Sequence, residues 1–286
     1  MAAVTQDPVA LLHVGMHKTG TTSFQAQLSA HDAELLEGGL LYPSTSRENP
    51  SVSHNLLAKE LLAARRHPMQ IRCVRDLFAE ISASGCDRVF ISFEELSMAW
   101  DRPALLDALR VELEQVGYRV HVLFSRREAE SFVPALYGTL VRMGMGIPRE
   151  DFERQARETG RVVVPRMGVW PKRVHCTDPD EMIESFSAVF GADRLHVVDY
   201  TSSGMVARIM ETQAWFFRDE AALLSDEDRE NVSGDLASRR RLENLLADVQ
   251  GSRVWRATAW TRSPTARRIR GTSVRLASRL RASSSS

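Results

Sequence analysis

The stretch VALLHVGMHKTGTTSFQAQL, residues 9–28, places the tightest constraint on how this chain can fold. Its first residues form an apolar run that predicts a buried strand, and its last residues open a helix. Gly15 and Gly20 lie between the two and permit a tight turn. A turn of this kind directs several backbone N–H groups and the positive end of the helix dipole at one point. The stretch therefore predicts an anion-binding loop.

The lysine of this loop lies where a magnesium–nucleotide site does not need it. The two glycines have the spacing of the nucleotide-binding pattern G-x-x-x-x-G-K-[ST], yet Thr21 follows the second glycine and Lys18 lies inside the loop. In that pattern the lysine reaches the β- and γ-phosphates and the next hydroxyl holds Mg²⁺. Lys18 is instead placed to approach the bridging atom of a shorter phospho-anhydride. We therefore expect anion binding without a metal.

Apolar runs and helical periodicity alternate along most of the chain. Buried strands are predicted at residues 9–14, 88–93, 119–124 and 195–198, with a further short strand within 38–44. Helices are predicted at about 21–30, 54–66, 70–84, 103–116, 127–142, 179–190 and 205–218. Strands that alternate with helices indicate an α/β fold with a mostly parallel sheet flanked by helices on both faces.

The charge of the chain is balanced overall but divided unevenly. Its 37 Lys and Arg residues offset its 37 Asp and Glu residues. Residues 251–286 carry nine Arg and no acid, so the first 250 residues carry a net charge of −9. We predict an α/β domain over 1–250 and a disordered, basic, Arg- and Ser-rich tail over 251–286. The alternative is a tail that folds on an anionic membrane surface or a nucleic acid, although we expect no specific nucleic-acid partner.

Cysteine usage and the N-terminal sequence indicate the compartment. Cys73, Cys86 and Cys176 are widely separated and odd in number, which favours reduced thiols over a disulfide framework or a zinc site. The N-terminus lacks a basic segment before its short apolar run, and no apolar stretch approaches the roughly 20 residues that span a bilayer. We therefore expect a cytoplasmic protein.

The sequence HKTGTTSFQ, residues 17–25, resembles the 5′-phosphosulfate loop of sulfotransferases, above all of bacterial members in which the loop begins near residue 15. Enzymes of this family use 3′-phosphoadenosine-5′-phosphosulfate as donor and have a three-layer fold like that of P-loop NTPases. The resemblance implies a sulfotransferase-like domain that acts on a hydroxyl or amine of a carbohydrate, lipid or small molecule. It also implies that the 5′-phosphosulfate is bound by residues of this loop: Lys18, Thr19, Gly20, Thr21 and Thr22. His17 is a further candidate of the donor site, where we expect it to shape the loop.

The family's second motif is a strand followed by arginine and, eight residues later, serine, which together hold the 3′-phosphate of the donor. This chain has the strand and two arginines, Arg126 and Arg127, either of which can contact a phosphate in bidentate fashion. The residues eight positions later are proline and alanine, so the serine of the family is missing and Ser131 is the candidate that replaces it. Residues 38–61 and 190–200 are also similar to stretches of these bacterial proteins.

Sulfuryl transfer needs a base that takes the proton of the acceptor, and the sequence offers two candidates. His54 opens a helix whose Leu57 and Leu61 share its face and pack inward, which would place the imidazole at the rim of a cleft. Glu94 follows a buried strand, at the edge of a parallel sheet where ligands bind. The family uses either a histidine or a glutamate, so the resemblance does not choose between them. Lys18 is the third catalytic candidate, because it supplies positive charge at the leaving phosphate.

Two other functions stay open at this stage. The first is a P-loop phosphotransferase or NTPase, because the strand before Glu94 resembles one that supplies an acid for Mg²⁺, although no lysine follows Gly20. The second is a non-catalytic binding protein on the same fold, because the serine of the second motif is missing. We expect the acceptor to bind in loops over the site, at residues 44–55, 95–103 and 143–175.

Overall fold

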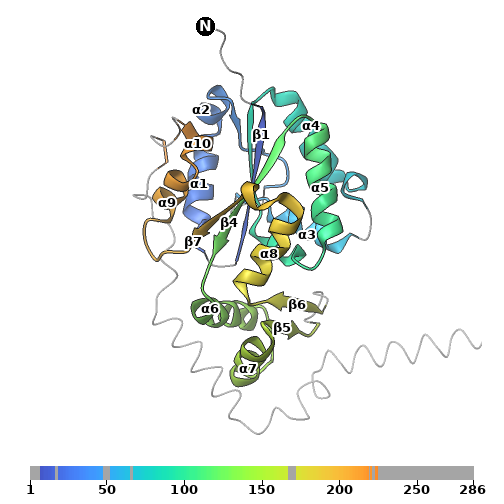
Figure 1. Ribbon diagram of the computed structural model, residues 1–286, viewed down its shortest axis with the longest axis vertical. Coiled ribbons are helices and arrows are strands. Elements are labelled where there is room, and N and C mark those ends of the chain that lie inside the picture. The colour runs from blue at the N-terminus through green and yellow to red at the C-terminus, as the bar shows by residue number, and fades with distance from the viewer. Residues whose placement is uncertain are drawn as a thin grey trace, which may run out of the picture. The chain divides into compact units, whose positions relative to one another are not determined.

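The computed structural model describes residues 7–16, 19–47, 52–64, 67–166, 172–218, 220, 223 and 224. The predictions for His17, Lys18 and the tail at 251–286, together with the domain boundary at 250, fall outside these residues. Inside them, the order of strands and helices confirms the predicted α/β class (Figure 1).

A five-stranded parallel sheet forms the middle layer of the described part of the chain (Figure 1). The strands lie in the order β2-β3-β1-β4-β7. They are β1 (Val9–Gly15), β2 (Leu40–Leu41), β3 (Arg88–Ser92), β4 (Arg119–Arg126) and β7 (Leu195–Asp199). β1 is central, with Val9 opposite Arg88 on one side and Arg119 on the other. All strands therefore end at the same edge, which is the edge where sheets of this kind bind ligands.

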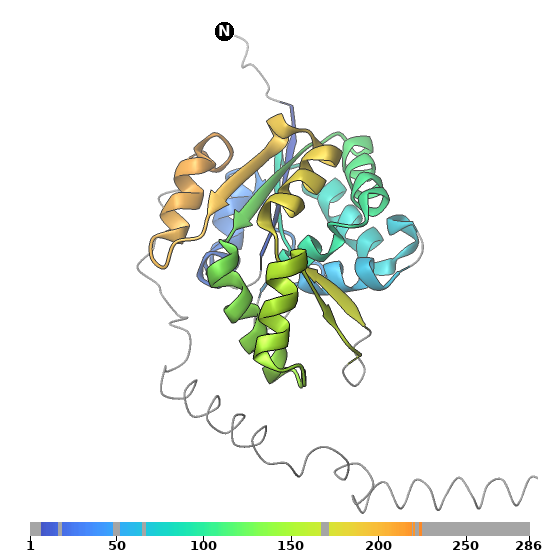
Figure 2. The ribbon, with the colours of Figure 1, turned by 60° about the horizontal axis from the view of Figure 1, so that its bottom comes forward.

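Helices cover both faces of the sheet and form the outer layers (Figures 1 and 2). One face carries α1 (Thr22–Ala30), α2 (Asp32–Glu37), α9 (Met205–Thr212) and α10 (Ala214–Phe217). The other face carries α3 (Asn55–Ala63), α4 (Arg72–Ser84), α5 (Pro103–Gln115) and α8 (Pro179–Phe190). The connections include the 3₁₀ helices η1 (Pro68–Gln70), η2 (Glu94–Ala99) and η3 (Ala192–Arg194).

The side chains of the central strand alternate between two hydrophobic clusters, one on each face of the sheet. From β1, Ala10, Leu12 and Val14 belong to the cluster beneath α4 and α5, whereas Leu11 packs with Phe24 beneath α1. Because both faces are covered, a parallel strand is apolar at nearly every position. This burial explains the continuous apolar run and confirms the predicted three-layer arrangement.

The chain adds a smaller group of elements beyond the carboxyl edge of the sheet. They are α6 (Ala129–Arg142), α7 (Arg149–Thr159) and an antiparallel hairpin of β5 (Arg161–Val164) and β6 (Arg173–Cys176) (Figures 1 and 2). The expectation of a loop over 143–175 is therefore wrong. The buried positions of α7 are sparse, Phe152 and Ala156, and the hairpin strands have four residues each. Packing such as that of the Tyr137 and Phe152 rings, 5.2 Å apart, stabilises elements whose local pattern is weak.

Two smaller differences concern helix limits. The helix predicted at 205–218 is divided at Gln213, whose φ of −110° and ψ of 25° leave the helical conformation. Residues 32–37 form α2, which is too short to give a periodic pattern. None of the helices in the described ranges is both long and apolar enough to cross a membrane.

Candidate functional site

The predicted anion-binding loop begins where β1 and β4 lie closest together. A Cβ atom on Gly15 would lie 2.8 Å from both the Cβ and the carbonyl oxygen of Ser125, so no larger residue fits there. Gly20 has φ of +74°, a backbone conformation that glycine adopts without strain. The chain then enters α1, with Thr21 as the residue before the first helical turn. The two glycines are thus required by the turn itself.

Thr19 is the clearest sign of a ligand in the described part of this loop. Its side chain is fully buried, and its hydroxyl has no hydrogen-bond partner among the described residues. Burying an unpaired hydroxyl costs about 1–3 kcal/mol. An anion with acceptor oxygens, bound at the N-terminus of α1, would remove this cost because it can accept from the hydroxyl.

Thr21 and Glu94 come together at the start of α1. The side chain of Thr21 makes no capping bond to its own helix, and its hydroxyl donates to the carboxylate of Glu94 instead. Glu94 reaches this position because η2 begins directly after β3, the strand beside β1. The structure therefore places the predicted carboxylate against the predicted phosphosulfate loop. Thr22 begins the helix on the same loop.

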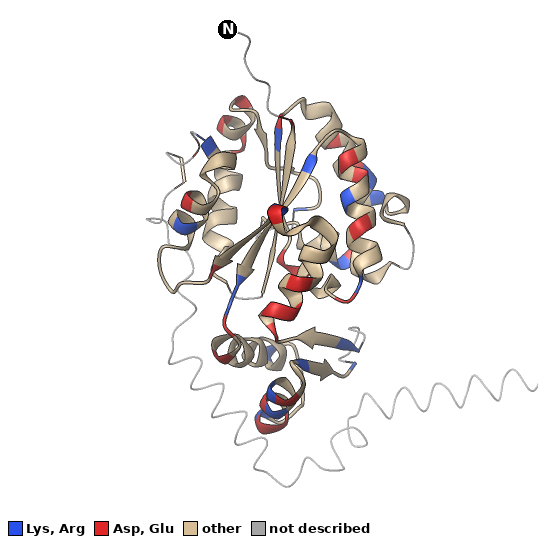
Figure 3. Ribbon diagram, in the orientation of Figure 1, with Lys and Arg blue, Asp and Glu red and all other residues tan. Residues whose placement is uncertain are grey.

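Arg126 is already paired with carboxylates. Its Nε donates to Asp199 at 2.6 Å, and its guanidinium lies 3.8 Å from Asp180 and 4.0 Å from Glu128. The hydrogen bond from Arg126 to Asp199 raises the pKa of the arginine above its ordinary value. Figure 3 shows acidic residues at the N-terminal end of α8, close to the end of β4. The positive charge of Arg126 is therefore compensated within the protein.

Arg127 lies in a different environment from its neighbour. Its Nε donates to Ser131 Oγ at 3.0 Å, and its guanidinium carbon lies 4.6 Å from the centroid of the Tyr200 ring. A Cβ on Gly20 would lie 3.5 Å from the same ring. Tyr200 thus connects the predicted anion-binding loop with the Arg127–Ser131 pair. We did not single out Tyr200 from the sequence, because its position depends on β7 lying beside β4.

His54 is buried and bonded to the backbone through both ring nitrogens. Its Nε2 donates to Pro43 O at 2.8 Å, and the Ser92 N–H donates to its Nδ1 at 3.2 Å. Burial lowers the pKa of His54 to about 4. Its helix packs inward as the sequence predicts, with Leu57 and Leu61 buried. In this arrangement the imidazole offers neither a lone pair nor a proton to a substrate.

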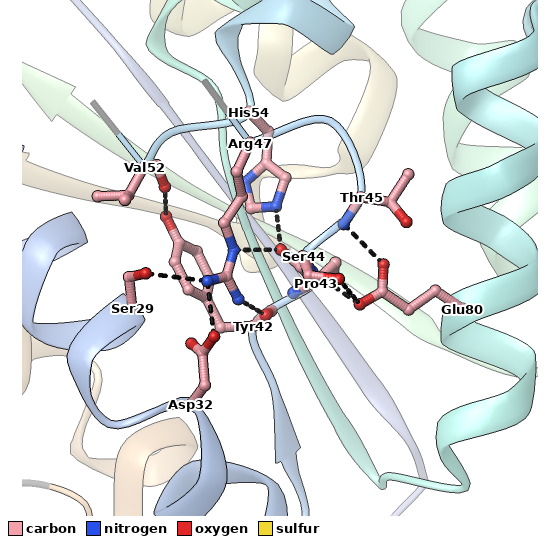
Figure 4. Close-up of polar contacts among 10 residues, drawn as sticks. All are labelled: Ser29, Asp32, Tyr42, Pro43, Ser44, Thr45, Arg47, Val52, His54 and Glu80. Atoms are coloured by element: carbon pink, nitrogen blue, oxygen red, sulfur yellow. Dashed lines mark hydrogen bonds and ion pairs between the residues drawn. The ribbon is translucent and has the colours of Figure 1, made fainter. Parts of the chain in front are cut away.

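The segment after β2 is held from both sides (Figure 4). Arg47 donates to Asp32 at 2.7 Å, and its guanidinium lies 4.3 Å from the centroid of the Tyr42 ring. From α4, Glu80 accepts from the backbone N–H groups of Ser44 and Thr45, at 2.7 and 2.8 Å. Burial alone would raise the pKa of Glu80, but these hydrogen bonds outweigh it and hold the pKa below its ordinary value. The described part of the expected acceptor loop 44–55 is therefore firmly anchored.

In the part of the chain that the structure describes, no group of three or more His, Cys, Asp or Glu side chains is placed to hold a metal ion. The fold and the site together define a three-layer α/β protein with a candidate anion site at the N-terminus of α1.

Comparison with known proteins does not assign the chain to a family. No protein-family model matches the chain, and no curated protein matches it. Among solved structures, a sulfotransferase from Alicyclobacillus acidocaldarius is similar, with a TM-score of 0.37 and 16% identity over 83% of this chain and 91% of that one. A structure from the PezAT toxin–antitoxin system of Streptococcus pneumoniae has a TM-score of 0.28 and 13% identity, over 75% and 87%. At these values neither likeness supports a function, which must come from the site.

Proposed function

We propose that the protein is a sulfotransferase that moves a sulfuryl group from 3′-phosphoadenosine-5′-phosphosulfate to a hydroxyl or amine of a carbohydrate, lipid or small-molecule acceptor. The observation that carries the proposal is the contact of the Glu94 carboxylate with the Thr21 hydroxyl at the N-terminus of α1. It joins a candidate base to the loop whose sequence resembles the phosphosulfate loop of that family. The buried, unpaired hydroxyl of Thr19 supports an anion at the same place.

The donor would bind at two points of this edge. The N–H groups of the loop, that of Thr21 among them, and the hydroxyls of Thr19 and Thr22 would hold the 5′-phosphosulfate, with His17 shaping the loop. Arg127 and Ser131 would hold the 3′-phosphate, because Arg126 is compensated by three carboxylates. A guanidinium suits this role since it presents several donors in one plane.

In the proposed reaction the acceptor oxygen or nitrogen attacks the sulfur atom. A new bond to sulfur forms while the bond between sulfur and the bridging oxygen breaks, and that oxygen leaves with the 5′-phosphate. Glu94 takes the proton of the acceptor, and the products are the sulfated acceptor and adenosine 3′,5′-bisphosphate. The loop N–H groups and Lys18 stabilise the negative charge that develops on the leaving phosphate.

The position of Glu94 favours this reaction over magnesium-dependent phosphoryl transfer. In a magnesium–nucleotide site the acid acts with the hydroxyl that follows the loop lysine. Here Glu94 contacts Thr21, which occupies the lysine position of that pattern, and not Thr22 at the hydroxyl position. A carboxylate that accepts from Thr21 lies beside the proposed anion, where it can take the proton of the acceptor.

The proposal is tested by incubating the full chain with sulfur-labelled donor and a panel of carbohydrate, lipid and phenolic acceptors. We expect label transfer without added Mg²⁺. Glu94→Gln should lower the rate at least about 100-fold, the usual contribution of a general base, and should still bind adenosine 3′,5′-bisphosphate. The matched control is Glu114→Gln, because Glu114 pairs with Arg110 at 2.6 Å at the C-terminal end of α5, before the start of β4 and away from the carboxyl edge of the sheet. This variant should leave transfer within about threefold.

Two outcomes would overturn the proposal. Binding of the bisphosphate without transfer to any acceptor would indicate a binding protein on this fold. Transfer that survives in Glu94→Gln at the wild-type rate would remove Glu94 as the base.

A further inference from the structure

A layer of polar side chains lies inside the sheet directly beneath the anion-binding loop. His13 of β1 is fully buried between two hydroxyls, with Nδ1 2.7 Å from Ser92 Oγ on β3 and Nε2 3.0 Å from Ser125 Oγ on β4. A neutral imidazole satisfies both contacts, as donor at one nitrogen and acceptor at the other. From α1, Gln25 Nε2 donates to Ser92 Oγ at 2.8 Å. The layer joins three strands to the helix that begins at the loop.

His54 holds Ser92 from the opposite side. The pairing of β2 with β3 ends at Leu41, which lies opposite Val89. At Ser92, His54 makes the hydrogen bonds that a paired strand would make. Its backbone N–H donates to Ser92 O at 2.7 Å, and its imidazole Nδ1 accepts from Ser92 N–H. Nε2 then donates to Pro43 O, on the continuation of β2. The imidazole therefore bridges the point where β2 and β3 separate.

Ser92 stands two residues before Glu94, so its position sets where the carboxylate lies. We propose that His54 and His13 are positioning residues, which hold Ser92 between β2 and α1 so that Glu94 faces Thr21 at the N-terminus of α1. The functional part of this inference rests on the proposed role of Glu94 as the base. A displacement of about 1 Å at a reacting group can cost about 100-fold in rate. A buried support of this kind therefore has a measurable effect on turnover.

Both imidazoles stay neutral, as this hydrogen-bond pattern requires. Burial lowers the pKa of His13 to about 3 and that of His54 to about 4. The charged side chains that face His54 are Arg47, which lowers its pKa further, and Glu80, which opposes this change. Neither histidine gains a proton at neutral pH, so each keeps one acceptor and one donor nitrogen.

The kinetic test compares His54→Leu with His54→Asn, whose amide oxygen can accept from Ser92 N–H. We expect His54→Leu to lower kcat about 10- to 100-fold with KM for the donor within about twofold, and His54→Asn to recover most of kcat. The acid limb of the pH profile, which reports Glu94, should persist in both variants. The matched control is His121→Leu on β4, where the imidazole bonds to His196 and not to Ser92.

Three kinetic results would contradict the positioning role. Loss of the acid limb in both variants would make His54 itself the base, and wild-type kcat in His54→Leu would remove any role. Should His54→Leu not fold, His54→Gln replaces it, because its amide lies one carbon farther out, where it can donate to Pro43 O but places no acceptor at the position of Nδ1. A kcat in His54→Gln equal to that of His54→Asn would then refute the inference.

Amide hydrogen exchange tests the same support without any turnover. Removing the acceptor at Nδ1 should speed exchange of the Ser92 amide at least about tenfold in His54→Leu or His54→Gln, and His54→Asn should restore protection. The amides of Val120 and Val122 in β4 are the internal control. Unchanged exchange at Ser92 would overturn the positioning role. If the wild-type protein transfers no sulfuryl group, the proposed function fails while these exchange rates still decide the inference.

Discussion

Replacing Arg127 should show how much the 3′-phosphate of adenosine 3′,5′-bisphosphate contributes to its binding. We predict that Arg127→Met weakens binding of adenosine 3′,5′-bisphosphate and leaves binding of adenosine 5′-phosphate nearly unchanged. Arg127 donates to Ser131 and lies over Tyr200, whose ring also lies next to Gly20 of the loop. In the proposed binding mode, Arg127 therefore contacts the 3′ end of a ligand whose 5′ end would lie at the N-terminus of α1.

The magnitude follows from the contacts that a phosphate would make there. A hydrogen bond to a charged group contributes about 1.5–3 kcal/mol, and 1.4 kcal/mol corresponds to a factor of ten in affinity. Arg127→Met should therefore raise Kd for the bisphosphate about 10- to 150-fold. Ser131→Ala removes a neutral hydroxyl, which contributes about 0.5–1.5 kcal/mol, and should raise it about 2- to 10-fold.

Isothermal titration calorimetry with both nucleotides measures this ratio directly. Arg126→Met is the matched control, since its guanidinium is bonded to Asp199 and lies near two further carboxylates. It should change the affinities for both nucleotides by the same factor. The reasoning is refuted if Arg126→Met abolishes the preference for the bisphosphate and Arg127→Met preserves it.

Two further predictions concern stability. Gly15→Ala places a Cβ 2.8 Å from the Ser125 carbonyl oxygen and should lower the free energy of unfolding by about 1–3 kcal/mol in urea titrations. The control is Gly146→Ala, whose Cβ meets nothing within 4 Å and should leave the free energy of unfolding unchanged. Equal stability of the two variants would contradict this prediction. Lowering the pH should also destabilise the protein, because the pKa values of His13 and His54 lie at about 3 and about 4 in the fold but near 6.5 in the unfolded chain. Below pH 6.5 the unfolded chain binds more protons than the folded one. The free energy of unfolding should therefore fall by about 1.4 kcal/mol for each histidine and each pH unit, between about pH 6.5 and about pH 4. Urea unfolding that gives equal stability at pH 7 and pH 5 would show that the histidines are not buried.

The glycine turn between β1 and α1 and most of the sheet could be predicted because their signals are local. The apolar run of β1 lies inside one stretch with Gly15 and Gly20, and a parallel strand buried on both faces is apolar throughout. The meeting of Glu94 with the loop also follows from the sequence, since neighbouring parallel strands end at the same edge. These inferences need no knowledge of distant contacts.

The parts that could not be predicted depend on tertiary contacts. Arg126 and Arg127 are adjacent in the sequence, and Asp199 and Tyr200 of the β7 end distinguish them by contacting one each. His54 lies at the start of an inward-packing helix as predicted. Both of its ring nitrogens are hydrogen-bonded to the backbone, because β2 ends before it can pair with Ser92. No periodicity in a single segment carries this information.

The most direct test of the central claim is thermal unfolding of the full chain with nucleotides in the presence of a metal chelator. If the loop before α1 binds a phosphosulfate, adenosine 3′,5′-bisphosphate should raise Tm without Mg²⁺, by an amount that grows with its concentration. In a parallel sample without chelator, ATP with Mg²⁺ should give a smaller increase at the same nucleotide concentration. An increase with Mg²⁺ and ATP alone, and none with the bisphosphate, would contradict the account.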